Sequence, residues 1–140
     1  MRTGTKLLVA FAVFVGSLPV LAHHSFSSEY DANRPVTLKG VVTKVEWLNP
    51  HAWFYIDVKD QSGNVQHWQC ESGPPNILVR NGWRKDSLKP GDEITVTGSQ
   101  AKDGTFTANA REVILPNGKK VFSGSAEEGP GAKSNGKATE

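Results

Sequence analysis

The chain has 140 residues, with 16 Lys and Arg against 14 Asp and Glu, so its formal charge of +2 is close to neutral. A charge this small gives no reason to expect nucleic acid or an anionic membrane surface as the partner. The single cysteine, Cys70, excludes an internal disulfide framework, so we expect one domain stabilised by a packed hydrophobic core.

Residues 1–22 have the pattern of a cleaved signal peptide. Two basic residues precede an apolar segment at 7–21, and Ala22 ends a small-residue cleavage motif. The apolar segment is short for a membrane helix, so we expect export to the periplasm and no stable membrane insertion. Cleavage after Ala22 would make His23 the first residue of the mature chain.

Three strands are expected in the first half of the mature chain. The first covers 36–47, where Gly40 permits a bulge or sharp bend that lets one strand serve two parts of a barrel. The second, at 52–59, alternates between apolar and polar residues, and its apolar set is the predicted core face. The third covers 65–71.

The second half begins with one short helix, which is predicted between Pro74-Pro75 and Asn81-Gly82. Strands at 93–98 and 105–115 follow, and a short extended piece at 119–122 is expected to cover an edge.

Three strands, a helix and two strands predict an all-β domain with one short helix. This is the β-β-β-α-β-β order of a small five-stranded OB-like barrel, with a β-sandwich as the alternative. The domain is expected to span 23–122, beginning with an N-terminal arm at 23–29. Residues 123–140 are rich in Gly, Ser and charge, and a disordered tail is expected there.

Three histidines are candidate metal ligands: His23, His24 and His51. An N-terminal His23 would offer both its α-amine and its ring nitrogen to one ion, and His24 or His51 would add a third nitrogen. Nitrogen ligands of this kind favour Cu(II), with Zn(II) second. Glu71 is a candidate oxygen ligand or a hydrogen-bond partner that orients a histidine. The alternative is that both N-terminal histidines are solvated arm residues and that His51 caps a strand.

The cleavage point affects this hypothesis. Cleavage one residue earlier would begin the chain Ala22-His23-His24, and a histidine at the third position is also a Cu(II)-binding arrangement. His67 is expected to face solvent, and Cys70 to lie in the core beside Trp68 as a small hydrophobe.

A second kind of site is predicted on the outward face of the second strand. Trp53 and Tyr55 lie there, and aromatic side chains on this face of an OB-like barrel can stack on ligands. The alternative is that the arm or the helix covers them. No catalytic motif is present, so we assign no catalytic residues and expect a binding protein rather than an enzyme. A copper-dependent oxidase built on the same N-terminal chelate is a third possibility.

The segments "AHHSFSSEYD", "PVTLKGVVTKVEWLNPHAWFYIDVKD", "NILVRNGWRKDSLKPGDEITVTG" and "TANAREVILPNGKKVFSG" together resemble a family of small exported proteins, mostly from Gram-negative bacteria, classed as a domain of unknown function. The resemblance covers about residues 22–124. Its signatures are His23-His24-Ser25-Phe26, Asn49-Pro50-His51 and Gly82-Trp83. The resemblance implies export and an OB-like fold, and it implies that His23, His24 and His51 belong to the family's pattern. It implies no particular reaction.

Overall fold

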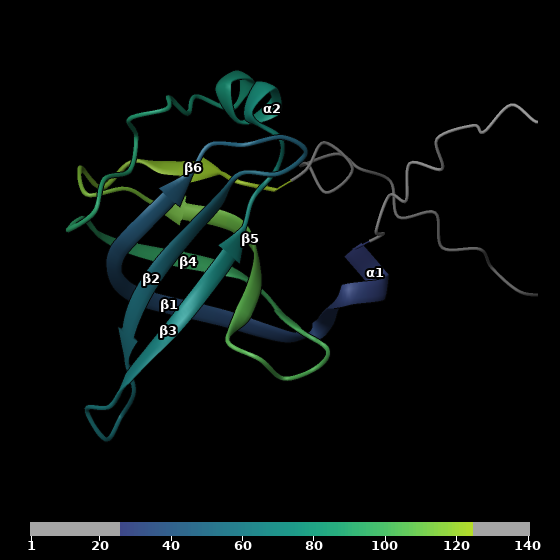
Figure 1. Ribbon diagram of the computed structural model, residues 1–140, viewed down its shortest axis with the longest axis vertical. Coiled ribbons are helices and arrows are strands. Elements are labelled where there is room, and N and C mark those ends of the chain that lie inside the picture. The colour runs from purple at the N-terminus through teal and green to yellow at the C-terminus, as the bar shows by residue number, and fades with distance from the viewer. Residues whose placement is uncertain (1–25, 125–140) are drawn as a thin grey trace, which may run out of the picture.

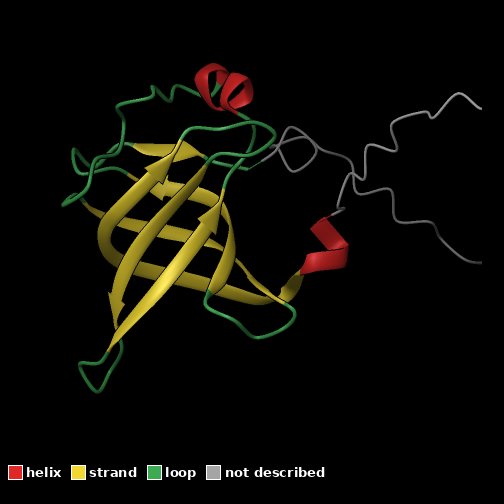
Figure 2. Ribbon diagram, viewed as in Figure 1, coloured by secondary structure: helices red, strands yellow, loops and turns green. Residues whose placement is uncertain are grey.

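The computed structural model describes residues 26–124 as a mostly β structure with two short helices. The predicted signal peptide, the histidines at 23 and 24, and residues 125–140 of the predicted tail lie outside the described residues. The tail is predicted to begin at residue 123, but Ser123 is fully buried and its backbone bonds to Gly73 and Arg111, so the folded part continues past residue 122. The elements, shown in Figures 1 and 2, are α1 (Phe26–Glu29), β1 (Tyr30–Glu46), β2 (Trp53–Lys59), β3 (Val65–Glu71), α2 (Pro75–Arg80), β4 (Glu93–Ala101), β5 (Thr107–Ile114) and β6 (Lys120–Phe122).

All six strands belong to one sheet in the order β3-β2-β1-β4-β5-β6, so the β-sandwich alternative is wrong. β3 also pairs with β5, which joins β1, β2, β3, β5 and β4 into a ring of hydrogen-bonded strands. The β3–β5 pairing is parallel and covers only residues 69–71, whereas the other pairs are antiparallel. The predicted order of strands and helix is confirmed, with α2 between β3 and β4.

Several details differ from the prediction. The piece expected only to cover an edge is a sixth strand, β6, paired with β5. The first strand begins at Tyr30 rather than at residue 36, because Tyr30 pairs with Ala101 across an irregular stretch that includes Pro35. Residues 26–29, expected as part of an arm, form α1.

β1 is the strand that two neighbours share. At Gly40 it is in register with Val58 of β2 on one side and Ile94 of β4 on the other. A Cβ at Gly40 would lie 2.6 Å from the backbone oxygen of Asp57, so the close approach requires glycine. The register irregularity with β2 falls a little further on, between Val42 and Lys44, rather than at Gly40 itself.

The core lies inside the ring and under α2. Alternation in β2 buries Phe54 and Ile56 as predicted, and β3 buries Trp68 and Cys70. α2 begins at its proline pair and buries Leu78, and Gly82 follows it with a φ of +92°. Trp83 then stacks on Phe54 and donates its indole N–H to the backbone oxygen of Phe122 at 2.8 Å.

Within residues 26–124, no helix is both long enough and apolar enough to cross a membrane.

Candidate functional site

A buried carboxylate at the end of β3 connects three separate segments of the chain. Glu71 is only 6% exposed. One of its oxygens contacts Nδ1 of His51, and the other accepts a hydrogen bond from the hydroxyl of Tyr30. The ring of His51 is still 37% exposed, so the cluster lies at the surface with its carboxylate on the inner side.

Backbone contacts hold His51 in place. It lies in the β1–β2 connection, after the cis peptide bond between Asn49 and Pro50. The next residue, Ala52, is buried and pairs with the segment that follows β3: its N–H donates to Gly73 at 3.2 Å, and its carbonyl accepts from Ser72 at 2.8 Å. Because Ser72 directly follows Glu71, this pairing sets His51 beside the carboxylate.

Tyr30 brings the N-terminal segment to the same place. Its ring stacks on that of Phe26, with 5.8 Å between the centroids. Lys102 fixes the segment from the other side, donating from Nζ to the carbonyl of Ser27 at 2.7 Å and from its backbone N–H to Glu29 at 2.9 Å. Burial, and then the hydrogen bond to Glu71, raise the pKa of the Tyr30 phenol well above its ordinary value. The phenol therefore stays protonated and acts as a donor.

This arrangement determines which nitrogen of His51 is available. A carboxylate only accepts hydrogen bonds, so Nδ1 of a neutral ring carries the proton and Nε2 keeps the lone pair. In many metal sites, the histidine that binds the ion donates its other ring N–H to a carboxylate, and His51 contacts Glu71 in the same way. Both oxygens of Glu71 are already engaged within the described residues, which favours an orienting role over direct coordination.

The described residues do not make a metal site by themselves. Within 26–124, no group of three or more His, Cys, Asp or Glu could hold a metal ion. The other two predicted ligands, His23 and His24, lie outside the described residues, so the complete ligand set stays a prediction. The structure does bring His51 and Glu71 together.

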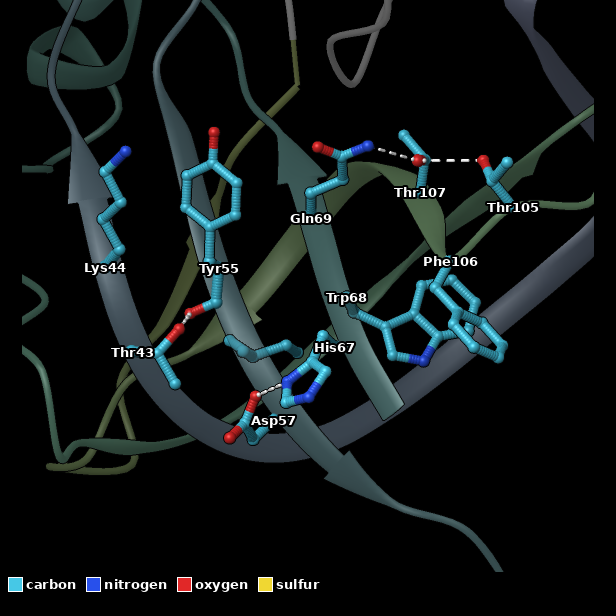
Figure 3. Close-up of a pocket in the computed structure, with 11 residues that line it drawn as sticks. Thr43, Lys44, Tyr55, Asp57, His67, Trp68, Gln69, Thr105, Phe106 and Thr107 are labelled. Atoms are coloured by element: carbon cyan, nitrogen blue, oxygen red, sulfur yellow. Dashed lines mark hydrogen bonds and ion pairs between the residues drawn. The ribbon is translucent and has the colours of Figure 1, made fainter. Parts of the chain in front are cut away.

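The two residues of the predicted aromatic face, Trp53 and Tyr55, lie in different surroundings. Tyr55 lines an open groove of about 430 Å³, whereas Trp53 is not among the lining residues and lies in register with Glu46 and Glu71. Figure 3 shows the groove across the outer face of the sheet; its lining is Thr43, Lys44, Tyr55, Ile56, Asp57, His67, Trp68, Gln69, Thr105, Phe106 and Thr107.

The remaining histidine and the cysteine lie as predicted. His67 is 81% exposed and its Nδ1 lies 2.6 Å from Oδ1 of Asp57. Cys70 is fully buried, and burial raises the pKa of its thiol well above the ordinary range. A buried, protonated thiol is a poor nucleophile, so Cys70 acts as a core residue.

Sequence reasoning missed Tyr30. It lies 41 residues from Glu71, and no local pattern of charge or periodicity relates the two positions. The one available signal was general: a buried glutamate requires hydrogen-bond partners, and tyrosine is a suitable donor.

These observations define a small, mostly β domain with a carboxylate-held histidine at the end of its strand ring. The chain belongs to a family of unknown function, DUF6152, whose model matches residues 12–110. No curated protein matches it.

Proposed function

We propose that this protein is an exported, periplasmic domain that binds a transition-metal ion, with copper preferred over zinc. The ligands would be the α-amine and ring of His23 at the mature N-terminus, together with His24 or His51. Glu71 would orient the ring of His51 from behind. The observation that carries the proposal is the contact of Nδ1 of His51 with buried Glu71, which leaves Nε2 as the nitrogen available to an ion.

The fold proposed is an OB-like barrel. The ring order β1-β2-β3-β5-β4, with α2 between β3 and β4, supports it, since that is the connectivity expected of a five-stranded OB barrel. Its β1–β2 connection carries His51.

The segment between the N-terminal histidines and Phe26 is short, which supports the proposal that these histidines reach His51. His24 precedes Phe26 by two residues and His23 by three, so their Cα atoms are within about 7 and 11 Å of that of Phe26. Phe26 itself stacks on Tyr30, and Tyr30 is hydrogen-bonded to Glu71. The proposal therefore places the mature N-terminus close to His51.

The ligand chemistry favours copper. An amine and imidazole nitrogens are ligands that Cu(II) binds more tightly than the other common divalent ions, and Zn(II) is the next choice. No nucleic acid is proposed as a partner, because the formal charge is close to neutral.

The test is copper binding by protein exported to the periplasm and purified without a tag or chelator. Intact mass should show a chain beginning at His23, and titration should give about one Cu(II) per chain. Because carboxylates behind a metal-bound histidine tune affinity, Glu71→Gln should weaken binding about tenfold, and His51→Ala at least as much.

His67→Ala is the matched control, since His67 is also held by a carboxylate but lies in the groove. It should leave copper affinity unchanged, and circular dichroism should show that every variant is folded. Copper binding no tighter in the wild-type chain than in His23→Ala would overturn the proposal.

A second candidate is a metal-independent site for a small ligand or partner on the Trp53 and Tyr55 face. One observation favours it: Tyr55 lines the groove. The residues that line the groove indicate the chemical class of such a ligand.

A further inference from the structure

One side of the groove is formed by a row of four side chains from four strands. Lys44 is in register with Tyr55, Tyr55 with Gln69, and Gln69 with Thr107. They therefore lie side by side across β1, β2, β3 and β5, as Figure 3 shows. Such a row exists only because β3 pairs with β5 at this level of the ring.

The charged groups around the groove pair with one another. Lys44 makes an ion pair with Glu46, and the hydrogen bond to Glu46 raises the pKa of the lysine. His67 pairs with Asp57 at 2.6 Å. Lys44 is the one lysine or arginine among the lining residues, all of which the structure describes, so the groove offers no unpaired cation to an anionic ligand.

What remains is a neutral array of hydrogen-bonding groups. The amide of Gln69 donates to the hydroxyl of Thr107 at 2.8 Å, and the Thr105 hydroxyl lies 3.0 Å from that of Thr107. An amide has two N–H donors and an acceptor oxygen, so Gln69 can still meet a ligand that both donates and accepts. The hydroxyl of Thr43 adds a further group on the opposite side, where it donates to the carbonyl of Tyr55.

Aromatic rings flank this array. Phe106 is 46% exposed and tilts against Trp68, with 5.3 Å between the ring centroids. Tyr55 stands on the other side, as Figure 3 shows, with the ammonium of Lys44 5.1 Å from its ring centre. Phe106 thus presents an exposed apolar ring beside the polar side chains of the groove, and ligand sites combine apolar and polar lining in this way.

We propose that this groove binds a neutral oligosaccharide, with Phe106 stacking on a sugar face and Gln69 and Thr107 hydrogen-bonding to sugar hydroxyls. A sugar ring presents one apolar face and a rim of groups that both donate and accept, which matches a ring beside an amide and hydroxyls. The volume of about 430 Å³ is within the range of small-molecule sites. A single-stranded nucleic acid is disfavoured, because such ligands require a positively charged groove.

The experiment is an NMR titration of the metal-free mature protein with cellohexaose, maltohexaose and chitohexaose. At least one should shift the indole N–H of Trp68 and the side-chain amide of Gln69 saturably. Phe106→Ala should weaken that binding about tenfold, and Gln69→Ala about fivefold. Val79→Ala on α2 and Gln61→Ala in the β2–β3 turn are the exposed, matched controls and should bind normally.

Three results would overturn the inference. One is that no neutral hexasaccharide shifts these resonances up to about 10 mM. Another is binding that is unchanged in both groove variants. The last is binding of decathymidylate or hexagalacturonate with none of the neutral sugars. Since no metal is present in this titration, its outcome is independent of the copper experiment.

Discussion

At the scale of single residues, Glu71 affects both the stability of the fold and the candidate site. A buried carboxylate is costly unless its oxygens are paired, and here the partners come from the start of β1 and from the β1–β2 connection. The same contacts that satisfy the carboxylate orient His51. Stability and the candidate site are therefore linked through one side chain.

Tyr30→Phe tests this link. Removing the hydroxyl leaves one oxygen of buried Glu71 without its donor, so the free energy of unfolding should fall by about 1–3 kcal/mol in urea denaturation. Tyr55→Phe is the control, because the Tyr55 hydroxyl bonds to half-buried Glu46 at 2.9 Å; its loss should cost only about 0.5 kcal/mol. Equal losses in the two variants would show that Glu71 does not depend on Tyr30.

At the scale of elements, adjacent strands of the ring approach very closely at glycines. Gly40 allows β1 to pair with two strands, and Gly98 does the same for β4 against β5. At Gly98 the register between β4 and β5 shifts by a bulge. A Cβ there would lie 1.9 Å from the backbone oxygen of Asn109, and backbone cannot move aside as a flexible side chain can.

Gly98→Ala should therefore lower the free energy of unfolding by about 3 kcal/mol, measured by urea denaturation. Ser99→Ala, at the next position, should change it by no more than about 0.5 kcal/mol. Wild-type stability in Gly98→Ala would mean that β4 and β5 are not held as closely as described.

At the scale of the whole molecule, buried acids should make the fold sensitive to alkali. Burial raises the pKa of Tyr30 and of Cys70, whose ordinary values are 10.0 and 9.0. The folded state keeps these protons at a pH where the unfolded chain releases them, so their stabilising contribution is complete below the ordinary values. It is lost progressively as the pH rises above about 9.

Urea denaturation at a series of pH values from 8 to 11 measures this loss. The midpoint should fall steadily above pH 9, and Tyr30→Phe should show a smaller fall because one of the two groups is gone. A midpoint that stays constant from pH 8 to pH 11 would contradict the assignment of these groups as buried and protonated.

The sequence by itself determined the features that depend on neighbouring residues. Alternation predicted the core face of β2, and the proline pair and Asn81-Gly82 predicted both ends of α2, because dihedral preferences and side-chain periodicity act over a few positions. The order of strands and helix along the chain followed from these elements, and the resemblance indicated a family of unknown function. His51 and Glu71 could be named as candidates from their chemistry alone.

Only the tertiary structure decided which side chains meet. The hydrogen bond of Tyr30 to Glu71 spans 41 residues, and the row from Lys44 to Thr107 depends on the register of four strands. The tertiary structure also showed that Tyr55 lines the groove and Trp53 does not, although alternation along the strand predicts both on one face. Contacts of this kind arise from strand pairing and ring closure, which join positions that no local pattern connects.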